Sequence, residues 1–135
     1  MELFEWKDSF SVSISKFDEQ HKQLISIINE LYCGINEKRG KELLNKTLKE
    51  LFEYTKSHFA DEEKEFRRFL YPDYIIHKLE HEKFVRQIAK FNESHKNDIQ
   101  DLSFEVFKFL QDWLQQHILS TDKKYASFLI SKGME

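Results

Sequence analysis

Apolar side chains recur every three or four residues through most of this sequence, which is the spacing of one face of an α-helix. The first stripe follows Asp18, a plausible N-cap, and predicts a helix over residues 19 to 38. Gly34 and Gly40 bracket its expected end. Its apolar members are Leu24, Ile25, Ile28, Leu31, Tyr32 and Ile35.

Three more stripes follow at the same spacing. The second spans residues 44 to 69 and ends before Tyr71-Pro72, because proline and the residue before it do not continue a helix. The third spans residues 77 to 91. The fourth opens near Asp101 or Ser103 and runs to residue 117. Each is long enough to be an amphipathic helix.

The two ends of the chain lack such long stripes. Residues 1 to 17 have no helical period and predict an extended arm that buries its apolar side chains against the helices. These side chains are Phe4, Trp6, Phe10, Val12, Ile14 and Phe17. At the other end, Tyr125, Phe128 and Leu129 predict one more short helical piece.

Four amphipathic helices joined by short connections predict an all-α fold, an antiparallel up-down-up-down four-helix bundle. We expect a single domain over residues 1–135. It would consist of the arm (1–17), the bundle (18–119) and a C-terminal segment (120–135).

Composition agrees with this architecture and narrows the setting. The chain has 13 Phe but only 3 Gly and 1 Pro, which favours long uninterrupted helices. Cys33 stands alone, so no intrachain disulfide can form, and the polar start is unlike a signal peptide. We therefore expect a cytoplasmic protein, and a monomer.

Charge and hydropathy give no reason to expect nucleic-acid or membrane partners. The net charge is -3 and comes from interspersed lysines and glutamates rather than blocks of one sign. No apolar run approaches the roughly 20 residues that cross a bilayer.

Five of the six histidines and two carboxylates form an ordered series that suggests a metal site. The series is His21, His58, Glu62, His77, His81, His117 and Asp122. Two pairs within it have i,i+4 spacing, so their side chains share one helix face. In the predicted topology the helix ends that carry these residues meet at one end of the bundle, and each of them except Asp122 lies on an apolar stripe.

Asp122 departs from this phase. It follows His117 by five residues, which is about 140° off phase on a straight α-helix. We therefore expect a π-bulge or a helix end to bring it back. His95 is in phase with His77, but it lies about 27 Å further along the axis and is excluded from the site.

Burial of so many imidazoles and carboxylates would cost several kcal/mol per charged group without a metal. The absence of thiolate ligands disfavours structural zinc, and seven ligands are too many for one tetrahedral ion. Two octahedral ions fit better. Five imidazoles, two bridging carboxylates and a bridging oxygen fill all but one of their positions, on preferences like those of non-haem iron.

The chain resembles the hemerythrin family in its single-domain bacterial and archaeal form. The resemblance rests on Trp6 and the arm, Asp18-Glu-Gln-His21-Lys, His58-Phe59 with Glu62-Glu63, Tyr71-Pro72, His77-x-x-x-His81, and Trp113-Leu-x-x-His117-Ile-x-x-Thr121-Asp122-x-x-Tyr125. Two positions depart from the usual pattern: Ser13, where Gly is common, and Phe66, where Met is common.

This resemblance implies reversible dioxygen binding at two iron ions (Fe2+/Fe3+) with an oxo or hydroxo bridge. One iron would be held by His77, His81 and His117, and the other by His21 and His58. Glu62 and Asp122 would bridge them, and the open position would lie on the iron with two histidines. Such a protein carries, stores or delivers oxygen and is not an enzyme. Its partner is dioxygen, and it could pass oxygen to an unknown protein recipient.

An apolar pocket should cover the open position, to keep out water and proton donors. The side chains placed to line it are Leu24, Ile25, Trp113 and Leu114, with Phe59 and Ile118 as further neighbours. Each imidazole should also have a hydrogen-bond partner for its second nitrogen, and Gln20 and Gln116 are candidates.

Other functions remain open from the sequence. The same metals could serve oxygen or redox sensing, or a di-iron oxidase, peroxidase or nitric oxide handling protein. His77-Lys-Leu-Glu80-His81 also matches the H-x-x-E-H zinc peptidase pattern, with Glu80 as general base. That reading leaves most of the series unexplained. A metal-free helical interaction module would require the whole series to be coincidence.

Overall fold

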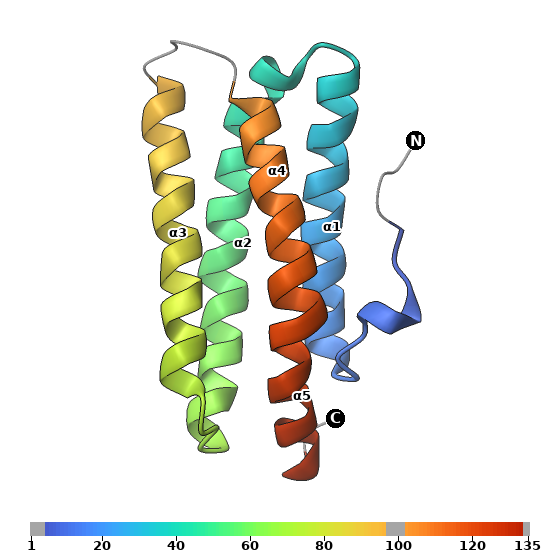
Figure 1. Cartoon of the computed structure of the whole chain (residues 1–135), viewed down its shortest axis with the longest axis vertical. Coiled ribbons are helices and arrows are strands. Elements are labelled where there is room, and N and C mark those ends of the chain that lie inside the picture. Colours follow the sequence, from blue (N-terminus) through green and yellow to red (C-terminus); the bar gives the residue numbers. More distant parts are fainter. Residues whose placement is uncertain (1–4, 97–101, 134–135) are drawn as a thin grey trace.

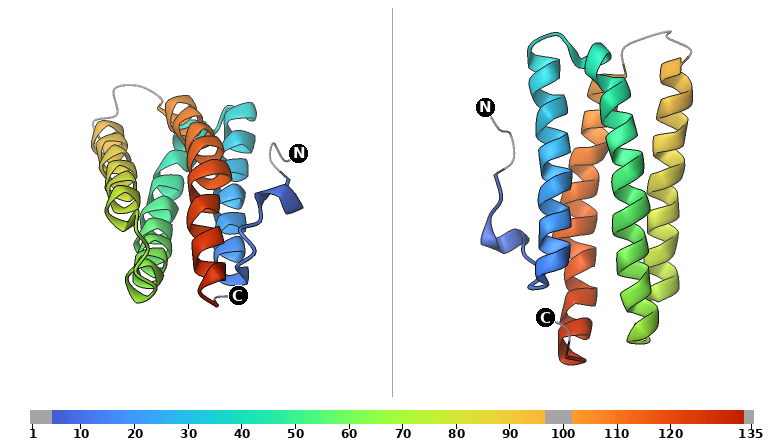
Figure 2. Two further views of the ribbon diagram at one scale, coloured as in Figure 1. Left: turned by 60° about the horizontal axis from the view of Figure 1, so that its bottom comes forward. Right: turned by 180° about the vertical axis from the view of Figure 1, so that it is seen from behind.

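Four helical rods account for most of the molecule (Figure 1). The computed structural model describes residues 5–96 and 102–133, and no strand occurs within them. Neighbouring rods run in opposite directions, as Figures 1 and 2 show, so the predicted all-α up-down-up-down bundle is confirmed. The rods are α1 (Ser15–Asn36), α2 (Gly40–Arg68), α3 (Tyr74–Lys96), and a fourth made of α4 (Ser103–Trp113), the π-helical segment η2 (Leu114–Thr121) and α5 (Asp122–Ser131).

The first helix begins three residues before Asp18, so the prediction of Asp18 as its N-cap is wrong. Asp18 lies in the first turn of α1, and its carboxylate accepts hydrogen bonds from the Val12 amide at 2.8 Å and the Ser11 hydroxyl at 2.5 Å. It therefore fastens the arm to the helix. A short side-chain acceptor before an apolar stripe suits either role, which is why the sequence did not distinguish them.

The arm is only partly extended. It contains a short 3-10 helix, η1 (Asp8–Phe10), before an extended stretch that leads into α1. Val12 and Ile14 are buried, whereas Trp6 and Phe10 are half-buried and pack against the main core. Phe4 lies outside the described residues. The expected burial of the arm is thus strongest next to α1.

Two helix ends are closed by residues in the left-handed conformation. Lys38 has φ 62° after α1, and Leu70 has φ 56° after α2. Behind Leu70, the Tyr71 amide donates to the Phe66 carbonyl at 2.9 Å, which satisfies a carbonyl at the helix end as a Schellman motif does. Glycine usually takes such positions.

The first helix ends at Asn36, between Gly34 and Gly40 as the sequence predicted, and Gly40 also has a packing role. A Cβ at Gly40 would lie 2.3 Å from the Ser103 hydroxyl and 2.8 Å from the Ser103 Cβ. Because Ser103 begins α4 and is buried, glycine at this position lets the starts of α2 and α4 approach closely.

The fourth rod continues without a break from α4 into α5 (Figure 1). The expected limit of the bundle at residue 119 falls inside the π-helical segment. The predicted C-terminal helical piece therefore forms the end of the fourth rod. Of the two devices expected to bring Asp122 back into phase, a π-bulge or a helix end, the structure has the π-helical one.

The interior has two apolar clusters with a polar layer between them. The larger cluster includes Leu24, Phe59, Phe84 and Leu114. The smaller, at the end of the bundle where the arm joins, contains Val12, Ile14, Phe17, Phe66, Tyr71, Tyr125, Ala126 and Leu129. On all four rods, the residues of the predicted metal site lie between members of the two clusters.

Among the described residues, no helix is both long enough and apolar enough to cross a membrane.

Candidate metal centre

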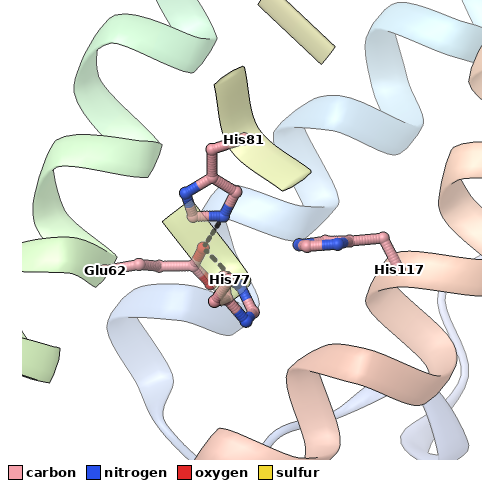
Figure 3. A group of neighbouring side chains, drawn as sticks. All are labelled: Glu62, His77, His81 and His117. Atoms are coloured by element: carbon pink, nitrogen blue, oxygen red, sulfur yellow. Dashed lines mark ion pairs between the residues drawn. The ribbon is translucent and has the colours of Figure 1, made fainter. Parts of the chain in front are cut away.

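The structure brings all seven predicted ligands together in the polar layer. Each is at most 4% exposed. They form two groups of closely spaced donor atoms: Glu62, His77, His81 and His117 in one, and His21, His58, Glu62 and Asp122 in the other. Figure 3 shows the first group, to which α2, α3 and the fourth rod contribute.

Glu62 divides its two oxygens between the groups. Its Oε1 lies 3.1 Å from His81 Nε2 and 3.8 Å from His77 Nε2. Its Oε2 lies 3.4 Å from His58 Nε2 and 4.0 Å from His21 Nε2.

Asp122, on the fourth rod, also divides its two oxygens between the groups. Its Oδ1 lies 2.9 Å from His117 Nε2 and 3.2 Å from His77 Nε2. Its Oδ2 lies 3.1 Å from His21 Nε2. Glu62 therefore offers each of its oxygens to two histidines, and Asp122 offers one oxygen to two histidines and the other to one. This division is the geometry of a bridge between two cations.

The π-helical segment explains how Asp122 reaches this position. The Asp122 amide donates to the His117 carbonyl, the i→i+5 bond of a π-helix. Residues five apart then lie on the same face, so the extra residue between His117 and Asp122 restores the phase that an α-helix would lose. π-Helical distortions within α-helices occur frequently at functional sites.

The donor atoms of this layer have few hydrogen-bond partners of their own. Among the described side chains, eight of the twelve buried polar atoms that lack one belong to the seven residues, and they include the Nε2 atoms of His21, His77, His81 and His117. Unpartnered buried polar atoms are rare in proteins, because each costs free energy. A metal ion between the imidazole nitrogens and carboxylate oxygens would satisfy them, so the residues fit a metal centre.

In the metal-free protein, protons on two of the histidines balance part of the negative charge of the carboxylates. Burial opposes the charged form of His117, but the carboxylates of Asp122, Glu80 and Glu62 outweigh it and raise its pKa to about 10. Burial likewise opposes the charged form of His77, while Asp122 and Glu62 raise its pKa to about 9.

Asp122 and His58 also have shifted pKa values. Burial and the neighbouring Glu62 act against ionisation of Asp122, yet His117 and His21 hold its pKa below the usual range. Burial lowers the pKa of His58 despite the nearby carboxylates. At neutral pH, His77 and His117 therefore carry protons beside the ionised carboxylates of Glu62 and Asp122.

Three histidines use their second nitrogen to contact a side chain on a neighbouring rod. His81 Nδ1 lies 3.0 Å from Glu63 Oε2, and His117 Nδ1 lies 2.8 Å from Glu80 Oε2. His58 Nδ1 contacts Gln20 Oε1. The candidate Gln20 is thus found in contact with an imidazole, while Gln116 lines a groove beside His117 and its predicted role stays a prediction.

Nothing in the sequence marks Glu63 as a partner, and the H-x-x-E-H pattern suggests a different role for Glu80. Both are adjacent in sequence to a ligand of their own helix, but each contacts a ligand of the next rod. The pairing depends on how the rods face one another, which the helical period alone does not predict.

Aromatic rings stack on the same three histidines. Phe59 lies parallel to His81 with ring centroids 3.8 Å apart, and Trp113 stacks on His117 at 3.9 Å. Tyr54 stacks on His58 at 5.1 Å.

Of the predicted pocket residues, Leu24, Ile25, Phe59 and Leu114 are buried in the larger apolar cluster, and Trp113 packs against it. Ile118 lies outside the part of the chain whose side chains the structure describes.

Two buried tyrosines flank the centre. The Tyr125 hydroxyl donates to Glu62 Oε2, and burial together with Glu62 and Asp122 raises its pKa well above the ordinary value. It therefore stays protonated as a donor. Tyr54 is also buried, but its hydroxyl has no hydrogen-bond partner within the described part of the chain.

Comparison with known proteins identifies the family of this site. Residues 12–129, which include all seven predicted ligands, match the family model described as the hemerythrin HHE cation binding domain. The chain is 32% identical over 127 residues to a bacteriohemerythrin of Clostridium acetobutylicum, covering 91% of this chain and 98% of the relative. This chain belongs to the hemerythrin family.

Other members of the hemerythrin family match this chain over similar lengths. A bacteriohemerythrin of Methylococcus capsulatus is 30% identical over 130 residues, covering 96% of this chain and 98% of the relative. A solved crystal structure of wild-type hemerythrin has a TM-score of 0.84 at 29% identity, covering 94% of this chain and 98% of that one. The four-helix hemerythrin architecture thus extends over nearly all of this chain.

Proposed function

We propose that this hemerythrin-family protein binds two iron ions in the polar layer and uses them to bind dioxygen reversibly. The observation that supports this most strongly is the division of Glu62 and Asp122 between two histidine groups. Members of the hemerythrin family bind a di-iron centre, and the donor set here contains imidazole and carboxylate without thiolate, which suits non-haem iron.

In this proposal one iron is held by His77, His81 and His117 and the other by His21 and His58. Glu62 and Asp122 would contribute one oxygen to each ion, and an oxo or hydroxo group would complete the set. With both carboxylates counted on each side, the group with three histidines has one more protein donor, so the open position for dioxygen would belong to the iron of His21 and His58.

When bound, the two ferrous ions supply the electrons that dioxygen binding requires, and the chain controls access and orientation. Leu24 and Ile25 follow His21 by one turn and are buried, and Leu114 precedes His117 by one turn. Apolar side chains at these positions exclude water from the open position. Tyr125 holds Glu62 by its hydroxyl and limits rotation of that carboxylate.

The chemistry of the ligand set favours binding over substrate oxidation. Oxygen-activating di-iron bundles rely on carboxylate-rich sites with Glu-x-x-His motifs. Here five imidazoles accompany two carboxylates. We therefore propose a carrier, store or source of oxygen rather than an oxidase, a peroxidase or a nitric oxide handling enzyme.

The zinc peptidase alternative loses support from the position of Glu80. A general base of that kind must face a metal-bound water, whereas Glu80 contacts the outer nitrogen of His117. His77 and His81 also share their layer with three more histidines.

Anaerobic reconstitution with ferrous iron tests the proposal. We expect two irons per chain and a visible charge-transfer band that forms in air and disappears under argon. Asp122→Asn, which removes a bridging carboxylate, should reduce iron binding and abolish the band, while His95→Gln, outside the layer, should leave both unchanged. One zinc per chain, or iron that oxidises without a reversible band, would contradict reversible binding.

A further inference from the structure

The two halves of the centre differ in what touches the outer nitrogens of their histidines. In the three-histidine half, the partners of His81 and His117 are the carboxylates of Glu63 and Glu80, at 3.0 and 2.8 Å. In the two-histidine half, the partner of His58 is the neutral amide of Gln20. His21 Nδ1 is buried and has no hydrogen-bond partner among the described residues.

The orientation of Gln20 is determined by its second contact. Its Nε2 donates to Asp61 Oδ2 at 2.7 Å, so its oxygen is the atom that faces His58. Lys16 lies 3.6 Å from the same Asp61 oxygen and offsets its charge. Among the side chains that the structure describes, no anionic one therefore contacts the outer nitrogen of either histidine in this half.

This difference matters because Nε2 of each imidazole points into the polar layer, where it would bind metal, and the ring proton would then lie on Nδ1. A carboxylate that accepts this proton makes the imidazole a stronger electron donor than an amide oxygen does. A stronger donor stabilises the more highly charged state of a metal. Glu62 and Asp122 are shared by both halves, so they do not cancel the difference.

We infer that Glu63 and Glu80 are positioning residues that make the three-histidine metal the easier of the two to oxidise. This inference rests on the proposed binding of two irons. A one-electron outer-sphere oxidant such as ferricyanide would take its electron from the iron of His77, His81 and His117. That iron changes from ferrous to ferric, the oxidant is reduced by one electron, and no bond forms or breaks.

A functional consequence follows for the proposed oxygen-binding iron. The iron of His21 and His58 would remain ferrous when the centre has lost one electron. Solvent moderates the effect, since the side chains of Glu63 and Glu80 are 17% and 36% exposed.

The test is an anaerobic redox titration of the reconstituted diferrous protein, with iron counted first. We expect two separate one-electron steps. Glu80→Gln keeps the shape of the side chain but removes its charge. It should change the equilibrium constant of the first step about tenfold in favour of the ferrous state, which raises the potential of that step by about 59 mV. Glu63→Gln should act in the same direction, the second step should move much less in both variants, and Glu80→Asp should restore part of the effect.

A matched exchange tests the other half. Gln20→Glu combined with Asp61→Asn keeps the total charge and reverses the contact, placing a carboxylate against His58. This variant should lower the potential of the second step and narrow the gap between the two steps. Equal shifts of both steps, or none, with two irons bound would overturn the inference and leave the proposed function intact. Fewer than two irons in the unsubstituted protein would overturn both.

A second measurement uses the unsubstituted protein, so it does not require any variant to bind iron. In the half-oxidised unsubstituted protein, pulsed electron paramagnetic resonance should count three strongly coupled imidazole nitrogens on the ferric ion. A count of two would place the first oxidation in the other half and overturn the inference.

Discussion

Tyr54 and Tyr125 are both buried beside the centre, yet within the described part of the chain only Tyr125 has a hydrogen-bond partner for its hydroxyl. Loss of its hydroxyl would leave the Glu62 carboxylate without this donor. We expect Tyr125→Phe to destabilise the metal-free protein by about 1–3 kcal/mol. Tyr54→Phe removes an unpartnered hydroxyl and should be neutral or slightly stabilising. Urea unfolding of both variants measures the difference, and equal losses would contradict it.

Ser13 is exposed and has φ 59°, a left-handed conformation that costs roughly 1 kcal/mol for residues other than glycine. We expect Ser13→Gly to stabilise the protein by about 0.5–1 kcal/mol, less the entropy that glycine adds to the unfolded chain. Ser26→Gly, an exposed serine within α1, is the matched control and should lose about 0.5 kcal/mol. Denaturant midpoints compare the two variants.

The conformation of Ser13 concerns one of the two positions at which the sequence departs from the usual hemerythrin pattern. The resemblance singled out Ser13 because glycine is common there, and the structure shows a backbone that favours glycine. Lys38 and Leu70 occupy similar conformations without any glycine signal, so neither could be recognised from the sequence.

The helical elements were predictable where one apolar stripe determines one face. The spacing of Leu24, Ile28 and Leu31, for example, was sufficient to predict α1 and its buried face. The contacts of Gln20, Glu63 and Glu80 run between neighbouring rods. Their geometry depends on the rotation of each rod, so only Gln20 was named as a partner in advance.

The π-helical segment lets us predict how a one-residue deletion affects iron binding. Deletion of Ser120 shortens the spacing of His117 and Asp122 to four residues, which an ordinary α-helix brings onto one face. We expect this variant to form a regular helix and retain two irons per chain. Deletion of Lys108, an exposed residue of α4, should rotate His117 and Asp122 by about 100° and abolish binding. Iron counting separates the two outcomes, and loss of iron in the Ser120 deletion would contradict the account.

For the molecule as a whole, the polar layer makes stability depend on pH. In the metal-free fold the pKa values of His77 and His117 are about 9 and about 10, above the ordinary histidine value. Their contribution to stability is complete below about pH 6.5 and is lost as the pH rises through these folded values. The depressed pKa values of Glu62 and Asp122 add stability above about pH 4, which is lost in acid.

We therefore expect the metal-free protein to be most stable near pH 5 to 6 and to weaken steadily towards pH 10. Thermal unfolding across this range measures the trend. The iron-loaded protein is the control, because metal replaces the protons and should remove the alkaline decline. A metal-free protein that is more stable at pH 9 than at pH 6 would show that these histidines are not the protonated partners of the carboxylates.

The layer between the two apolar clusters also sets an order of events in the cell. Its residues extend from His21 to Asp122, so a ribosome must synthesise nearly the whole chain before the site can exist. Once the bundle has folded without metal, protons on His77 and His117 balance the carboxylates. Iron would then enter a finished bundle and displace those protons, which makes loading a maturation step that acidification of the surroundings would slow.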